Sequence, residues 1–195
     1  MHPTACRLNI IAAIVAVMAL CGIAGSAIAA SVDEQRNEIR KMRKETLAQL
    51  YKVHPAARAS IQKAAGYAVF SNVGVNLIFF SAAGGSGVAH DNRSGKDIYM
   101  KMISGGIGLG LGVKDFRGVF VFANHDAFKQ FVESGWEASA QADAAAKSGE
   151  KGGAAAGAIT VAPGVDLYQI TENGLALQAT IQGTKYYKDD DLNAK

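Results

Sequence analysis

Hydrophobic and polar residues follow three different patterns along the chain, and each pattern predicts a different structure. Residues 8–23 form an almost unbroken apolar run. Residues 31–53 repeat apolar positions at three- and four-residue steps, which predicts an amphipathic helix. A second helix is expected over residues 55–65, because proline suits the first turn of a helix. From Gly66 onward, short apolar runs separated by glycines and polar turns predict β-strands.

The β-rich part is expected to form one sheet. Its candidate strands are residues 67–70, 73–81, 97–103, 118–123, 158–161 and 165–170, with a polar turn over 90–95. One further short helix is expected over 126–133, capped by Asn124, and Asn173-Gly174 predicts a hairpin. Glycines alternate through 105–112, which favours a strand with one bare face over a phosphate-binding loop. The pattern predicts an α+β fold: N-terminal helices packed on a strongly bent antiparallel β-sheet or barrel.

The first 29 residues have the features of a secretory signal peptide. Arg7 precedes the apolar run, and Ala27 and Ala29 fit the small-x-small pattern that a signal peptidase recognises. Cleavage is therefore expected after Ala29, with export to the periplasm or cell envelope. The alternative is a retained membrane anchor, although the run is shorter than the ~20 apolar residues of a typical span.

Removing this signal changes the composition of the working protein. The two cysteines, Cys6 and Cys21, both lie in the signal, so the mature chain would have no disulfide and no thiol chemistry. It would keep 19 basic and 17 acidic residues, a balance too close to neutral to indicate a nucleic-acid partner. The expected organisation is a signal peptide (1–29), an N-terminal helical segment (30–65), a β-rich domain (66–187) and a charged tail (188–195).

The sequence lacks a recognisable catalytic or metal-binding arrangement. His54, His90 and His125 are far apart in sequence and do not have the spacing of a ligand pair. Ser86 lies among glycines but lacks the Gly-x-Ser-x-Gly spacing of a nucleophile. The aspartates at 189–191 indicate a solvated acidic tail, because the interleaved spacing of a calcium loop is missing. We therefore expect no enzyme activity, no metal and no cofactor.

One local charge asymmetry lies on the predicted first helix. At ~100° per residue, a helical wheel gathers an apolar stripe of Ile39, Met42, Thr46, Leu50 and Val53. One side of this stripe, the basic flank, consists of Arg36, Arg40, Arg43 and Lys44. The other side, the acidic flank, consists of Glu34, Glu38 and Glu45. A basic flank beside an apolar stripe is typical of a helix on an anionic membrane. The pattern slightly favours the alternative, in which the stripe packs on the β domain and both flanks are solvated.

The order of several short motifs resembles the SYLF domain family. The motifs are Gly66–Phe70, the glycine-rich 105–112, Gly118–Phe122, 128–137 with Gly135-Trp136-Glu137, and Asn173-Gly174-Leu175 through Gly183. Over about residues 53–187 the chain looks like the bacterial exported branch of this family, which is related to the lipid-binding domain of yeast actin-patch proteins. The resemblance implies lipid binding without catalysis, partly through an N-terminal amphipathic helix. Actin is not expected as a partner of an exported bacterial protein.

These observations lead to one functional expectation and one alternative. We expect a non-enzymatic lipid-binding protein of the bacterial envelope, engaging anionic phospholipid through the basic amphipathic helix, the β domain or both. The candidate lipid-binding residues are Arg36, Arg40, Arg43 and Lys44. The alternative is a structural or protein-interaction module of the periplasm without a lipid ligand, which the near-neutral charge would suit. The sequence names neither the lipid nor a protein partner.

Overall fold

The computed structural model describes residues 31–72, 84–104, 117–137, 157–171, 174–175 and 184–194. Its helices in these residues are α2 (Val32–Val53), α3 (Ala56–Lys63), α4 (His125–Ser134) and α6 (Asp190–Asn193). Its strands are β1 (Gly66–Ser71), β2 (Gly84–Asp91), β3 (Asp97–Ser104), β4 (Arg117–Phe122), β5 (Trp136–Glu137), β6 (Ile159–Ala162), β7 (Val165–Thr171), β8 (Gly174–Leu175) and β9 (Thr184–Lys188). The predicted α+β class is therefore confirmed.

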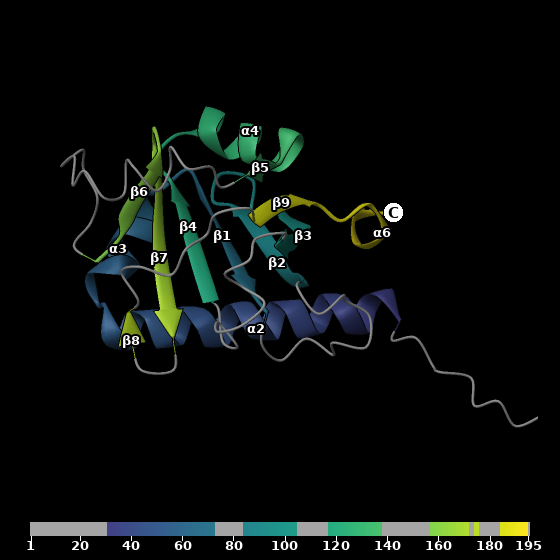
Figure 1. Ribbon diagram of the computed structural model, residues 1–195, viewed down its shortest axis with the longest axis horizontal. Helices are drawn as coiled ribbons and strands as arrows, with labels where there is room; N and C mark the ends of the chain where they lie inside the picture. Colours follow the sequence, from purple (N-terminus) through teal and green to yellow (C-terminus); the bar gives the residue numbers. More distant parts are fainter. Residues whose placement is uncertain are drawn as a thin grey trace, which may run out of the picture. The chain divides into compact units, whose positions relative to one another are not determined.

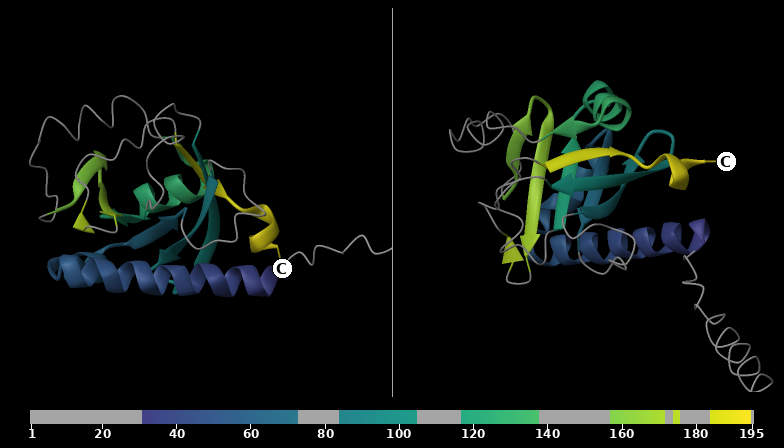
Figure 2. Two further views of the ribbon diagram at one scale, coloured as in Figure 1. Left: turned by 60° about the horizontal axis from the view of Figure 1, so that its bottom comes forward. Right: turned by 45° about the vertical axis from the view of Figure 1, so that its right-hand side comes forward.

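All of these strands belong to one sheet, in which every described pair is antiparallel. The strand order is β5-β9-β3-β2-β1-β4-β7-β6, and β8 pairs with β7 (Figure 1). The sheet bends into a half-barrel, with α2 along one face and α4 on the other (Figure 2). This is the packing of helices on a strongly bent sheet that the sequence predicted.

The two faces of the sheet have separate cores. Facing α4 is an aromatic cluster whose largest members are Phe70, Phe120, Phe122, Phe131 and Tyr186. Facing α2 and α3 is a mainly aliphatic cluster, in which Ile39, Leu50 and Ile61 pack with Val69, Val88 and Val119. Because side chains alternate across a strand, neighbouring residues such as Val119 and Phe120 serve different cores.

On the α2 face, the strand register arranges side chains in three rows across the sheet. The middle row is Tyr99, Val88, Val69, Val119 and Tyr168. One outer row is Asp97, His90, Tyr67, Val121 and Asp166. The other outer row is Lys101, Ser86, Ser71, Arg117 and Ile170. The apolar stripe of α2 packs on the middle row, so each flank of the helix meets a row that contains charged or polar side chains.

Glycines in β2 make room for large side chains on the aromatic face. A Cβ atom on Gly87 would overlap the ring of Phe70, and one on Gly85 would lie 2.6 Å from Met102 Cε. The glycine segment 105–112, predicted as a strand with one bare face, lies outside the described residues, as does the predicted strand 73–81.

Most predicted elements have their expected bounds to within a few residues, and the caps agree. Asn124 begins α4 by accepting a hydrogen bond from the Ala127 backbone N–H. Gly135 ends this helix with φ of 71°, a left-handed value that favours glycine. A hairpin is present where it was expected, with Thr171 of β7 paired to Gly174 of β8, while the predicted turn lies partly outside the described residues.

Three expectations were wrong. His90 was placed in a turn, but β2 continues through Asp91, because His90 pairs with Asp97 across the hairpin. Val53 was placed in the apolar stripe of α2, but it is 41% exposed and lies outside the buried part of the stripe because it ends the helix. The tail was expected to be solvated, whereas it contains α6, which buries Leu192.

Candidate functional site

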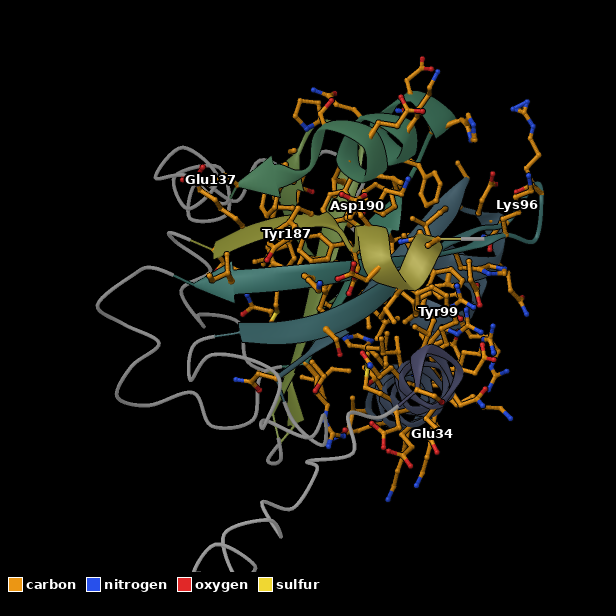
Figure 3. The ribbon with its side chains drawn as sticks, turned by 90° about the vertical axis from the view of Figure 1, so that its right-hand side faces the viewer. Glu34, Lys96, Tyr99, Glu137, Tyr187 and Asp190 are labelled. Carbon is orange, nitrogen blue, oxygen red and sulfur yellow. The ribbon has the colours of Figure 1, made fainter. Side chains whose placement is uncertain are left out.

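The apolar stripe of α2 is buried, so the described structure has the packed arrangement of this helix. Ile39 and Leu50 are at most 2% exposed, and Thr46 is 1% exposed. The basic flank beside the stripe turns toward β3 and α6. Figure 3, which looks along α2, places Tyr99 between this helix and α6. The flank is therefore partly an internal contact surface of the fold.

Asp97 is the centre of a charged cluster at the edge of the basic flank. Its Oδ1 atom lies 2.6 Å from Arg43 Nη1 and 2.6 Å from His90 Nδ1. Arg40 Nε lies 3.9 Å from Asp97 Oδ2. Partial burial disfavours the carboxylate, but the hydrogen bonds from His90 and Arg43 and the charge of Arg43 outweigh it. The pKa of Asp97 is therefore below its usual value.

The ring of Tyr99 lies beneath two arginines of the same flank. The Cζ atoms of Arg36 and Arg40 are 5.8 Å and 5.7 Å from the ring centroid. At this distance a guanidinium is attracted to the aromatic ring. Burial raises the pKa of Tyr99, against the opposing influence of Arg40. Arg36 and Arg40 are thus held by an aromatic side chain as well as by carboxylates.

Arg36 also binds the last residues of the chain. Its Nε donates to the Leu192 carbonyl oxygen at 2.9 Å, and its Nη2 donates to the Ala194 carbonyl oxygen at 2.8 Å. The carbonyl oxygens at the end of a helix have no partner within that helix, so an arginine there satisfies them. Arg36 Nη1 further lies 3.2 Å from Asp33 Oδ1. This contact surface of residues 189–194 against α2 and β3 is called the C-terminal clasp below.

Asp189 and Asn193 bind the C-terminal clasp to β3 through an ion pair and hydrogen bonds. The Asp189 side chain accepts from the backbone N–H groups of Asp191 and Leu192, which caps α6. Lys101 Nζ lies 3.0 Å from the Asp189 carboxylate. Asn193 accepts from the Tyr99 backbone N–H and donates to the Tyr99 carbonyl oxygen. Asp189 is only 2% exposed, so this part of the predicted solvated acidic run is buried instead.

The basic character of the flank continues past Arg43 along α2 into α3. Lys44 is exposed and forms no ion pair among the described residues. Arg58 of α3 lies over the ring of Tyr51, with 4.3 Å from its Cζ to the ring centroid. The ring of Tyr67 is 5.2 Å from that of His90. We call the surface of Lys44, Tyr51 and Arg58 the open basic edge.

Charge is unevenly divided between the helical segment and the rest of the chain. Residues 32–63 contain eight basic and four acidic residues, a surplus of four positive charges. Residues 64–195 contain eleven basic and thirteen acidic residues, which leaves two negative charges. The net positive charge of the domain is therefore concentrated on α2 and α3, although its total charge is close to neutral.

The structure divides the four predicted lipid-binding residues into two kinds. Arg36, Arg40 and Arg43 have partners within the fold, in the clasp, at Tyr99 or at Asp97. Lys44 has none of these partners, so it remains available to a ligand.

Sequence reasoning missed Asp97, Tyr99 and the tail as partners of the basic flank. The spacing of His90 and Asp97 held a usable signal: a turn between two strands brings residues at its ends together as a cross-strand pair. Contacts between α2 and the tail left no local signal, because they join opposite ends of the sequence.

Among the described residues, no group of three or more histidine, cysteine, aspartate or glutamate side chains is placed to hold a metal ion. None of the helices described is both long and apolar enough to cross a bilayer. The site is thus an α+β scaffold with a basic, tyrosine-bearing helical edge.

Comparison with known proteins shows a similarity to a bacterial protein. The chain is 36% identical over 161 residues to a protein named beta cell expansion factor A from Aeromonas veronii. The similar region covers 82% of this chain and 59% of that protein. This chain thus spans only part of its relative, whose name specifies neither a ligand nor a reaction. No family model matches the chain.

Proposed function

We propose that this chain is a SYLF-type, non-enzymatic lipid-binding protein of the bacterial envelope, which binds anionic phospholipid through the open basic edge. The resemblance of its ordered motifs to the SYLF family supports the lipid-binding class. The signal-like first 29 residues support export to the envelope, where anionic lipid is present. The proposal involves neither a metal nor a cofactor, and it includes no actin or nucleic-acid partner.

The single observation that carries the proposal is the exposed cationic surface that Lys44 and Arg58 form on α2 and α3. Lys44 and Arg58 are exposed, and no carboxylate among the described residues pairs with either side chain. Tyr51, whose ring lies under Arg58, is half-buried, so it offers an amphipathic ring of the kind enriched at membrane interfaces. Each lysine or arginine near an anionic membrane surface contributes about 1 kcal/mol of attraction.

The geometry favours binding with α2 still packed on the sheet. Detachment would expose Ile39 and Leu50, and each such side chain contributes roughly 1.5–3 kcal/mol when buried. Insertion of the stripe into lipid would recover that burial, but the middle row of the sheet would then be exposed. Detachment would also break the bonds of Arg36 to the clasp and of Arg43 to Asp97. A peripheral, electrostatic contact keeps all of these interactions.

Charge reversal at the open basic edge tests the proposal. Lys44→Glu and Arg58→Glu should each weaken co-sedimentation with phosphatidylglycerol vesicles several-fold at low salt, because each replaces an attraction by a repulsion. The matched control is Lys129→Glu on α4, which covers the other face of the sheet. This control should bind like the unmodified protein, and the difference should shrink as salt screens the charges.

Two results would count against this function. Equal weakening by Lys44→Glu and Lys129→Glu would show a dependence on net charge without a defined surface. Absence of vesicle binding by the unmodified protein would favour the alternative of an interaction module without a lipid ligand. In that case, native mass spectrometry of the protein from cells should show a stoichiometric protein partner and no retained lipid.

A further inference from the structure

A hollow of about 220 Å³ lies beside α2, on the side away from the basic flank. Its lining includes the carboxylates of Glu38 and Glu45 and the cations Lys41 and Arg117. Met42 and Thr46, which are at most 9% exposed, contribute buried side chains to its lining. The hollow therefore combines opposite charges around a defined floor, where the acidic flank of α2 meets the polar outer row of the sheet.

The charges around this hollow are only partly paired with one another among the described residues. Half-buried Arg117 donates a hydrogen bond from Nη1 to Gln49 Oε1 at 2.5 Å, which is a neutral partner. Among the described residues, Arg117 and Glu38 form no ion pair, although both line the hollow. Lys41 Nζ is 4.0 Å from Glu45 Oε1, a loose and largely exposed contact. A partly desolvated guanidinium without a carboxylate partner is electrostatically unsatisfied.

We propose that this hollow binds a small zwitterion, in which a primary ammonium is joined by a short linker to a phosphate ester. The phosphate would lie toward Arg117 and Lys41, because a guanidinium pairs with phosphate through two parallel hydrogen bonds. The ammonium would lie toward Glu38 and Glu45. Phosphoethanolamine has this chemistry, either as a lipid headgroup or as a soluble ester.

The balance of charge selects a zwitterion over simpler ligands. A purely anionic ligand would meet the two carboxylates, and a purely cationic ligand would meet Lys41 and Arg117. A neutral ligand with separated charges avoids both repulsions. The hollow therefore favours a zwitterion because its carboxylates repel anionic ligands and its cations repel cationic ligands. This site does not rest on the proposed binding of anionic membranes, which uses the opposite flank of α2.

The site can be tested with soluble probes and the full chain. In an amide NMR titration, glycerophosphoethanolamine should give saturable shifts at Met42, Thr46 and Arg117. Glycerophosphoglycerol, which is anionic, and ethanolamine, which is cationic, should each bind about tenfold more weakly, because each lacks one charged contact. No saturable shift, shifts outside the hollow, or equal binding of the three probes would overturn the proposal.

Two variants separate the poles of the site. Glu38→Gln removes an exposed carboxylate without altering the core, and it should weaken glycerophosphoethanolamine about tenfold while glycerophosphoglycerol binding does not weaken. Arg117→Gln should weaken both phosphate esters. The control Glu133→Gln, on α4, should change neither. Unchanged zwitterion binding by Glu38→Gln, in a protein whose amide spectrum is otherwise preserved, would contradict the proposal.

Vesicles then distinguish the source of the ligand and keep the two proposals apart. Vesicle binding is compared between phosphatidylcholine alone and phosphatidylcholine with added phosphatidylethanolamine. If phosphatidylethanolamine increases binding, and Glu38→Gln abolishes this increase, the site is assigned to a lipid headgroup. Binding of the soluble ester without this gain would assign it to a free phosphate ester, and either result supports the site. Lys44→Glu should weaken anionic vesicle binding but leave the glycerophosphoethanolamine titration unchanged, so each proposal fails by a different measurement.

Discussion

The two faces of the sheet are built on different physical principles. On the α4 face, aromatic rings contact one another, with Phe70 and Phe120 at 4.7 Å and 5.0 Å from Tyr186 between ring centroids. On the α2 face, an aliphatic centre is bordered by rows that contain Asp97 and Arg117. The aromatic face gains stability from burial and ring packing. The α2 face also carries the charges that match the flanks of its helix, and these charges leave positions open to ligands.

This difference explains how α2 is oriented. An apolar stripe alone would allow the helix to lie on the middle row in either direction. Arg43 meets Asp97 on one side, and Gln49 meets Arg117 on the other, so reversal of the helix would separate these partners. Polar contacts at the margins of an apolar interface contribute more to specificity than to affinity. The α4 face relies instead on the fit of large rings.

Removing a ring from the aromatic face should have the largest effect on stability. Phe120 is fully buried and contacts Phe70, Phe131, Trp136 and Tyr186. Phe120→Ala should lower the free energy of unfolding by about 3–5 kcal/mol, measured by urea denaturation. The matched change on the opposite face, Val119→Ala, removes fewer atoms and should cost less. Equal losses of unfolding free energy in Phe120→Ala and Val119→Ala would contradict the larger contribution of ring packing on the α4 face.

Breaking the charged margin of the α2 face should have an intermediate effect. Asp97→Asn leaves Arg43 and His90 without their carboxylate, and we expect a loss of about 1.5–3 kcal/mol in the free energy of unfolding. The exposed Asp126→Asn is the control and should change little.

The same carboxylate predicts a pH dependence. The pKa of Asp97 is lowered in the folded protein, so its contribution is fully present above the unfolded value of ~3.9. That contribution should be lost as the pH falls below this value and through the lower folded pKa. The stability difference between the unmodified protein and Asp97→Asn, followed by denaturation at decreasing pH, should shrink in that acidic range. A difference that stays constant would contradict this assignment.

The smallest of these effects is expected at the C-terminal clasp. Asp189→Ala removes the cap of α6, which should cost about 0.5–2 kcal/mol of stability. Because Lys101 loses a partner as well, amide exchange should accelerate in α6 and in the first turns of α2. Asp190→Ala, at an exposed neighbouring position, is the control. Equal exchange in both variants would show that the clasp does not hold α2.

Elements with a local signal could be predicted from the sequence. The stripe of Ile39, Met42 and Leu50 repeats with the helical period, so both α2 and its buried side followed from the order of residues alone. The cap at Asn124 and the hairpin before Gly174 also depend on adjacent residues, and both were confirmed.

Features that depend on strand register could not be predicted with the same success. Arg43 and Asp97 are 54 residues apart, and they meet only because β3 lies beside α2. The tail was misjudged for a related reason. Its aspartates suggested solvation, but Leu192 among them reaches a core formed by distant residues. The basic flank thus lies on one side of α2 as the sequence predicted. Which of its cations have partners depends on the fold, which pairs Arg36, Arg40 and Arg43 but leaves Lys44 without an ion pair among the described residues.

The C-terminal clasp has a consequence for the order in which the chain can fold. Arg36 and Leu192 are separated by 156 positions, and Tyr99 and Asn193 by 94. Contacts of such long sequence separation form late, because the closure of a large loop precedes them. The apolar stripe of α2 is therefore expected to pack on the sheet before Arg36 bonds to Leu192 and Ala194, so that the C-terminal clasp closes after the helix is in place.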